Sequence, residues 1–171
     1  DAIFVTGQLG GSGAGKHLEF EPRLAEARWL AGHFDVHSMI DLSDGLAGDL
    51  RHLLTASRVG AELLTSAIPI SRAARERARS FNADAMTQGT PRPVGPPGKP
   101  PLLAALTDGE DFELLFTLAS RDAVPLIDAW KERFPKLPLS CIGKIMAGSG
   151  LFLKDHNGIR PLEAHGYVHF T

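Results

Sequence analysis

The sequence predicts an α+β domain, in which a mixed β-sheet carries packed helices. Short apolar runs with strand character interleave with segments whose apolar residues recur at helical spacing. One Asn-Gly pair also joins two apolar runs, which is typical of a β-hairpin and therefore of antiparallel strands. The 171 residues suit one domain, or at most two small ones.

The first third of the chain alternates strands and helices. Residues 1–6 are an apolar strand that runs into a glycine-rich segment at 7–15. Pro22 suits the first turn of a helix, and apolar residues recur at helical spacing as far as Phe34. A buried strand is then predicted at 37–40.

The next elements continue the alternation. A leucine stripe predicts a helix over 46–54, with Gly60 beyond its end. A strand is predicted at 61–65, and Ser71 is the expected N-cap of a helix whose arginines at 72–79 form a solvated face.

Residues 89–101 differ from the rest of the chain. Six of the twelve prolines fall within these 13 residues, and proline removes the amide donors that helices and sheets need. We expect a long exposed or poorly ordered loop here, inserted into a single domain that spans 1–171.

The last third begins with an acidic turn and an apolar strand at 112–118. Ser120 opens a helix that reaches Phe134. Strands are predicted at 139–145, 151–154 and 159–162. Asn157-Gly158 joins the last two through a type I′ turn.

Composition excludes several classes of protein. The 18 basic and 20 acidic side chains give a net charge of −2, which argues against a nucleic-acid partner. No apolar run approaches the roughly 18–20 residues that cross a bilayer, so no membrane partner is expected. The lone Cys141 is compatible with the cytoplasm. Because the first residue is Asp1 rather than methionine and a strand is predicted from the first residues on, we interpret the chain as a piece of a longer polypeptide.

The glycine-rich segment fits most of a phosphate-binding loop. Residues 10–16 match G-x-x-x-x-G-K and follow a strand. However, His17 stands where a Ser or Thr would bind Mg²⁺, and Pro22 delays the helix whose amides would bind the phosphate. We therefore favour a glycine connection that contacts phosphate without being a P-loop.

Asp41-x-Ser43-Asp44-Gly45 is the most informative stretch. At the end of a strand, Asp41 and Ser43 point to the same side, and Asp44 follows at the helix entrance. Carboxylate and hydroxyl oxygens at such a junction suit Mg²⁺. The alternative is that Asp44 or Ser43 only caps the helix, and spacing by itself favours this alternative.

A second acidic cluster lies at Gly109-Glu110-Asp111-Phe112-Glu113. In an extended chain Asp111 and Glu113 share one face, and Glu110 and Phe112 take the other. These carboxylates could bind a metal or a cationic ligand, or they could form a solvated turn.

Taken in order, these motifs resemble the C-terminal half of the thiamine-monophosphate kinase family, within the aminoimidazole-ribonucleotide-synthetase-like superfamily. The resemblance is carried by residues 1–7 with their glycine-rich continuation, 40–46 with Asp49-Leu50, 109–116 and 166–170. It covers nearly the whole chain apart from the region around 89–101, and it shifts the 41–44 motif toward a functional role.

The resemblance implies ATP-dependent phosphorylation of thiamine monophosphate to thiamine diphosphate, with Mg²⁺. It assigns Asp41 and Asp44 to Mg²⁺ and places Ser43 beside the ATP phosphates. Glu110 would face the substrate, and Tyr167 or Phe170 would give its cationic ring an aromatic wall.

The same resemblance implies a missing N-terminal domain that carries further aspartates and much of the ATP site. It leaves room for a homodimer of the full-length enzyme. Asp108 stands where the family often has glycine, which adds charge beside the substrate turn. Two alternatives stay open: another enzyme of the superfamily, such as a cyclo-ligase or a selenophosphate synthetase, and a non-catalytic binding module.

Overall fold

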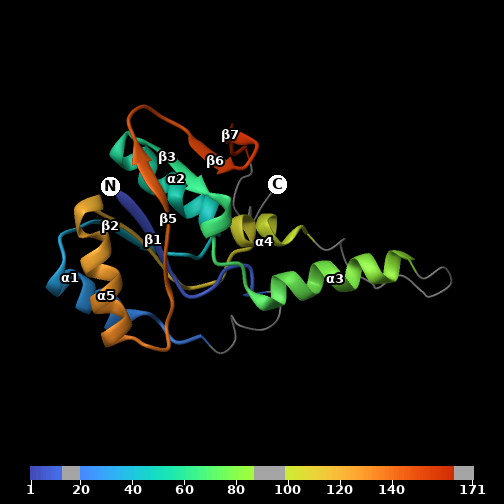
Figure 1. The fold of residues 1–171 in the computed structure, drawn as a ribbon, viewed down its shortest axis with the longest axis horizontal. Helices are drawn as coiled ribbons and strands as arrows, with labels where there is room; N and C mark the ends of the chain where they lie inside the picture. The colour runs from blue at the N-terminus through green and yellow to red at the C-terminus, as the bar shows by residue number, and fades with distance from the viewer. Residues whose placement is uncertain (13–19, 87–98, 164–171) are drawn as a thin grey trace.

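A seven-stranded mixed sheet forms the centre of the molecule (Figure 1). The computed structural model describes residues 1–12, 20–86 and 99–163. The strand order is β2-β4-β1-β5-β3-β6-β7, and only β3 and β6 pair in parallel. The strands are β1 (Ala2–Thr6), β2 (Val36–Asp41), β3 (Gly60–Leu64), β4 (Leu114–Leu118), β5 (Leu139–Met146), β6 (Leu151–Asp155) and β7 (Gly158–Pro161). The predicted α+β class with a mixed sheet is confirmed.

Helices pack on both faces of this sheet. The buried side of α1 (Leu24–His33) and α5 (Ala123–Arg133) shares one core cluster with β1 and β4. On the other face, α2 (Leu46–Ser57) and α4 (Pro101–Thr107) share a second cluster with β1, β3 and β6. The remaining described α-helix, α3 (Arg72–Met86), projects away from the sheet (Figure 1).

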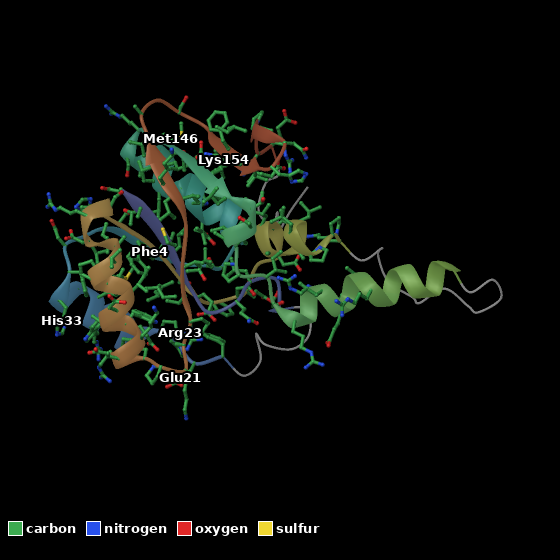
Figure 2. All side chains as sticks on the ribbon, viewed as in Figure 1. Phe4, Glu21, Arg23, His33, Met146 and Lys154 are labelled. Atoms are coloured by element: carbon green, nitrogen blue, oxygen red, sulfur yellow. The ribbon has the colours of Figure 1, made fainter. Side chains whose placement is uncertain are left out.

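Strand β1, an interior strand between β4 and β5, supplies both cores because its side chains alternate between the two faces. Ile3 and Val5 belong to the cluster under α2, whereas Phe4 belongs to the cluster under α5. Phe4 stacks on Phe116 of β4 with ring centroids 5.5 Å apart. Figure 2 shows Phe4 in the interior, among the side chains of the sheet and the neighbouring helices. This burial holds β1 in place, and the candidate site begins at its C-terminal end, at Thr6.

Several local predictions are confirmed and others need correction. The Ser71 hydroxyl accepts a hydrogen bond from the Ala74 amide, as expected for an N-cap of α3. The 151–162 hairpin is present, but Asp155 pairs with Gly158, and among the described residues of this turn only Gly158 has positive φ. The turn is therefore not type I′, which needs positive φ at both central residues.

Helix α4 corrects the boundary of the proline-rich segment. Pro101 occupies its first turn, where a missing amide hydrogen costs nothing. Lys99 and Pro100 have no regular structure, and residues 87–98 lie outside the described part of the chain. Among the described helices, none combines the length and the apolar character that crossing a membrane requires.

Candidate active site

The predicted Mg²⁺ motif occupies the junction between β2 and α2. Asp41 ends β2 opposite Leu114, and both Asp41 and Ser43 are exposed on either side of the buried Leu42. This alternation is the one predicted for a strand end. The helix N-cap is Gly45, at φ +94°, and no side chain caps it by a hydrogen bond. The simple capping role considered for Ser43 and Asp44 is therefore wrong.

A buried side chain from inside α2 closes this loop. Asp49 is 2% exposed, and its carboxylate accepts a hydrogen bond from the Asp44 amide at 3.0 Å. Burial raises the pKa of Asp49, and the charges of Asp44 and Asp41 add to this effect, while hydrogen bonds from the Asp44 and Ser43 amides oppose it. Asp41, Asp44 and Asp49 thus form one region of negative potential.

Asp49→Asn is expected to stabilise the metal-free chain more at neutral than at acidic pH. A folded-state pKa above the ordinary value of about 4 means that stability is lost as pH rises through that window. Asparagine does not titrate, so the variant escapes this loss. Thermal midpoints in EDTA from about pH 3 to about pH 7 measure it. A variant-minus-parent difference that stays flat or falls with pH would contradict the raised pKa.

The second acidic motif docks directly on the first. The Glu110 amide donates to the Ser43 carbonyl at 2.8 Å, and the Phe112 amide donates to the Leu42 carbonyl at 2.9 Å. Gly109 permits this approach, because a Cβ there would lie 2.5 Å from the Ser43 carbonyl oxygen. Two motifs that are distant in sequence therefore present Ser43 and Glu110 from adjacent backbones.

The other carboxylates of the second motif have structural partners. Glu113 is buried, and it accepts hydrogen bonds from the Thr6 hydroxyl at 2.8 Å and from Arg23 at 2.9 and 3.1 Å. Gly7, at φ +61°, leaves the space that this carboxylate fills. Burial alone would lower the pKa of Arg23, but its bonds and attraction to Glu113 outweigh that effect and raise the pKa.

Asp111 engages the start of the glycine-rich segment. Its carboxylate accepts hydrogen bonds from the amides of Gly10 at 2.7 Å and Gly11 at 3.1 Å. These two amides are therefore directed at a protein carboxylate rather than at a ligand phosphate. The expectation that the segment is no P-loop stays a prediction for the rest of the motif. Lys16 and His17 lie outside the described residues.

The expected extended backbone of this motif is wrong in detail. Glu110 and Phe112 both adopt left-handed conformations, at φ +63° and +50°. Asp111 and Glu113 are nevertheless both buried, whereas Glu110 is exposed. The motif is neither a solvated turn nor an all-acidic metal site.

Asp108 is not an isolated charge beside this turn. Its carboxylate pairs with Arg77 of α3 at 2.8 Å and with Lys99 at 2.9 Å. Arg77 also donates to the Gly10 carbonyl at 2.6 Å. The prediction that the arginines at 72–79 form only a solvated face is therefore wrong for Arg77.

Three side chains of the α2 region could hold a cation. Asp44, Asp49 and His52 each place one ligand atom within 4.8 Å of the others, and this is the single such group found among the described residues. Asp41 is outside the group, although its charge acts on Asp49. No hydrogen bond or ion pair from the described residues occupies the carboxylates of Asp41, Asp44 or Glu110. Oxygen donors free of other partners fit Mg²⁺.

The aromatic residues divide between described and undescribed parts of the chain. Tyr167 and Phe170, expected to line the substrate ring, lie outside the described residues. Phe112 stacks on Phe20 with ring centroids 4.0 Å apart, which the sequence did not predict. The role of Asp49 is not predicted from the sequence beyond its place in the motif. Its position one turn after Gly45 is the signal that could indicate it.

Comparison with known proteins identifies close relatives. Residues 1–92 match the family described as "AIR synthase related protein, C-terminal domain". The thiamine-monophosphate kinase of Rhodopirellula baltica is 40% identical over 171 residues, covering 99% of this chain and 48% of the relative. That of Escherichia coli K12 is 32% identical over 194 residues, covering 100% of this chain and 53% of the relative. The chain thus spans about half the length of these curated relatives.

Solved structures agree with these relatives. One described as "AaThiL complexed with AMPPCP and TMP" is 29% identical, with a TM-score of 0.67 over 99% of this chain and 51% of that one. The hydrogenase maturation protein HypE of E. coli is 18% identical with a TM-score of 0.66 over 95% of this chain and 48% of that one, which supports the fold alone.

Proposed function

Given that this chain belongs to the family of AIR synthase related proteins, C-terminal domain, we propose that it is the C-terminal half of a thiamine-monophosphate kinase. The enzyme would transfer the γ-phosphoryl group of ATP to the phosphate of thiamine monophosphate, giving thiamine diphosphate and ADP. A full-length enzyme of this kind would include an N-terminal domain with much of the ATP site. We place the full-length enzyme in the cytoplasm, where it could form a homodimer.

One observation carries this proposal beyond the similarity itself. The Glu110 amide donates to the Ser43 carbonyl, so the loop assigned to ATP and the turn assigned to thiamine are in direct contact. Phosphoryl transfer depends mainly on holding the donor and the acceptor in line. A hydrogen bond between the two loops supports a site in which both substrates meet.

The proposed roles follow the chemistry of the free side chains. Asp41 and Asp44 would hold Mg²⁺ at the mouth of the β2–α2 loop, and when bound the ion supplies positive charge to the β- and γ-phosphate oxygens. Ser43 would lie beside the phosphates. The exposed Glu110 carboxylate would attract the cationic thiazolium ring and accept from the aminopyrimidine. Tyr167 or Phe170 would supply the aromatic wall.

The 171-residue chain alone is expected to turn over thiamine monophosphate negligibly with Mg·ATP. Stabilising a transferring phosphoryl group needs several cations and fixed donors, and the proposal assigns half of these to the N-terminal domain. A coupled ADP-release assay compares the chain alone with the chain joined to that domain. Turnover by the chain alone in the usual kinase range of about 1–100 s⁻¹ would contradict this division of the site.

The same joined protein tests the substrate against the superfamily alternatives. Thiamine monophosphate should raise its melting temperature in the presence of a non-hydrolysable ATP analogue, whereas a purine-pathway ribonucleotide should not. A shift with the ribonucleotide alone would favour a cyclo-ligase. No shift with either would favour a binding module.

A further inference from the structure

Two tethers join the glycine-rich segment to the turn that carries Glu110. The first is Asp111, which is 1% exposed and whose two carboxylate oxygens each accept one amide, from Gly10 and Gly11. Hydrogen bonds to a charged acceptor are stronger than those between neutral groups, so the two bonds to Asp111 are strong ones. This tether connects the residues after β1 to the residues before β4.

The second tether engages the carbonyl of the same glycine, whereas the first engages its amide. Arg77 donates to the Gly10 carbonyl at 2.6 Å and to Asp108 at 2.8 Å. Asp108 and Asp111 lie on either side of Glu110 in the sequence. The backbone of Glu110 is therefore held between two links that converge on Gly10.

The conformation of the turn depends on such links. Glu110 and Phe112, which flank Asp111, both have positive φ, a backbone conformation that residues other than glycine rarely adopt. Strained backbone persists only where its surroundings over-determine it. The same two residues donate their amides to the Ser43 and Leu42 carbonyls, so Asp111 lies between two residues that are hydrogen-bonded to the segment joining β2 and α2.

We propose that Asp111, assisted by Arg77, is a positioning residue that sets the separation between the Gly10-Gly11 backbone, Glu110 and Ser43. This inference rests on the proposed function, because the fixed separation would serve a substrate with a phosphate at one end and a cationic ring at the other. Asp111 does not itself touch substrate. It acts through the amides of Gly10 and Gly11 and through the backbone of Glu110.

Amide hydrogen exchange in the 171-residue chain tests the coupling without any enzymatic readout. Asp111→Asn leaves one acceptor oxygen and turns an NH₂ group toward an amide donor. We expect exchange at Gly10, Gly11, Glu110 and Phe112 to accelerate at least about tenfold. Glu62→Gln is the matched control, because Glu62 of β3 is also a buried carboxylate and pairs with Lys144 of β5 and Lys154 of β6. It should leave these four amides unchanged.

Arg77→Gln provides a second variant that should fold, because the Arg77 side chain is 39% exposed. It removes the other tether, and we expect a smaller acceleration at the same amides. If Asp111→Asn unfolds the chain, Arg77→Gln alone decides the outcome. Unchanged exchange at Glu110 and Phe112 in every folded variant would overturn the proposal.

Kinetics of the joined two-domain protein separate positioning from plain stability. At a temperature where each variant is folded, Asp111→Asn should raise the KM for thiamine monophosphate about tenfold. Glu62→Gln should leave this KM unchanged. A KM within twofold of the parent would contradict positioning. An inactive parent would count against the proposed function, and the exchange result would still decide whether Asp111 couples the two segments.

Discussion

Asp41→Asn is expected to lower the kcat of the joined kinase about a hundredfold while leaving the thermal midpoint without ligands nearly unchanged. Asparagine keeps the shape of aspartate and still accepts hydrogen bonds, so a structural turn would lose little. Asp41 is exposed at the end of β2, and no described residue bonds its carboxylate. Removing its charge should therefore change the free energy of unfolding little. A Mg²⁺ ligand, by contrast, loses the charge that offsets the ion.

The expected size follows from transition-state arithmetic. If the lost interaction strengthens in the transition state, about 3 kcal/mol slows the step by about two orders of magnitude. The measurement is kcat at saturating Mg·ATP, paired with the thermal midpoint of the same variant. Asp35→Asn is the matched control, because Asp35 is an exposed aspartate just before the other end of β2.

Two outcomes would count against the metal role of Asp41. A kcat within about threefold of the parent, a loss of only about 0.6 kcal/mol, would mean that the charge is not used in catalysis. A collapse of the thermal midpoint would mean that the side chain holds the junction of β2 and α2 together.

Of the variants proposed for this chain, Glu113→Gln is expected to lower the free energy of unfolding most, by about 3 kcal/mol. The Glu113 side chain is 2% exposed, and its carboxylate receives the Thr6 hydroxyl and two Arg23 nitrogens. Glutamine removes the charge and turns an NH₂ group toward groups that are themselves donors. The half-buried guanidinium of Arg23 then loses its partner, and an uncompensated charge is costly.

Thermal denaturation of the 171-residue chain measures this loss. For a domain of this size, about 3 kcal/mol corresponds to a midpoint lowered by roughly 6–12 °C. Asp128→Asn is the matched control, since Asp128 forms an exposed pair with Lys131 at 3.9 Å, and such pairs contribute at most about 1 kcal/mol. Equal shifts in the two variants would show that the Glu113 network contributes no more to stability than an exposed ion pair.

The sequence by itself determined the elements and the local chemistry of this protein. Apolar spacing predicted the strands and most of the helices, because burial on one or both faces imposes a period that can be read directly. The exposed positions of Asp41 and Ser43 followed from the alternation of a strand end. Motif order indicated the superfamily, and the match over residues 1–92 shows that the chain belongs to the family of AIR synthase related proteins, C-terminal domain.

Only the tertiary structure decided which polar groups meet. The contact of the Glu110 turn with Ser43, the closure of the loop by Asp49 and the pairing of Arg77 with Asp108 all join residues through packing. Glu113 and Glu110 look alike in sequence, yet one is buried against Arg23 and the other is exposed. Sequence patterns record how a segment is buried, whereas the partner of a charge depends on how separate segments are arranged in the fold.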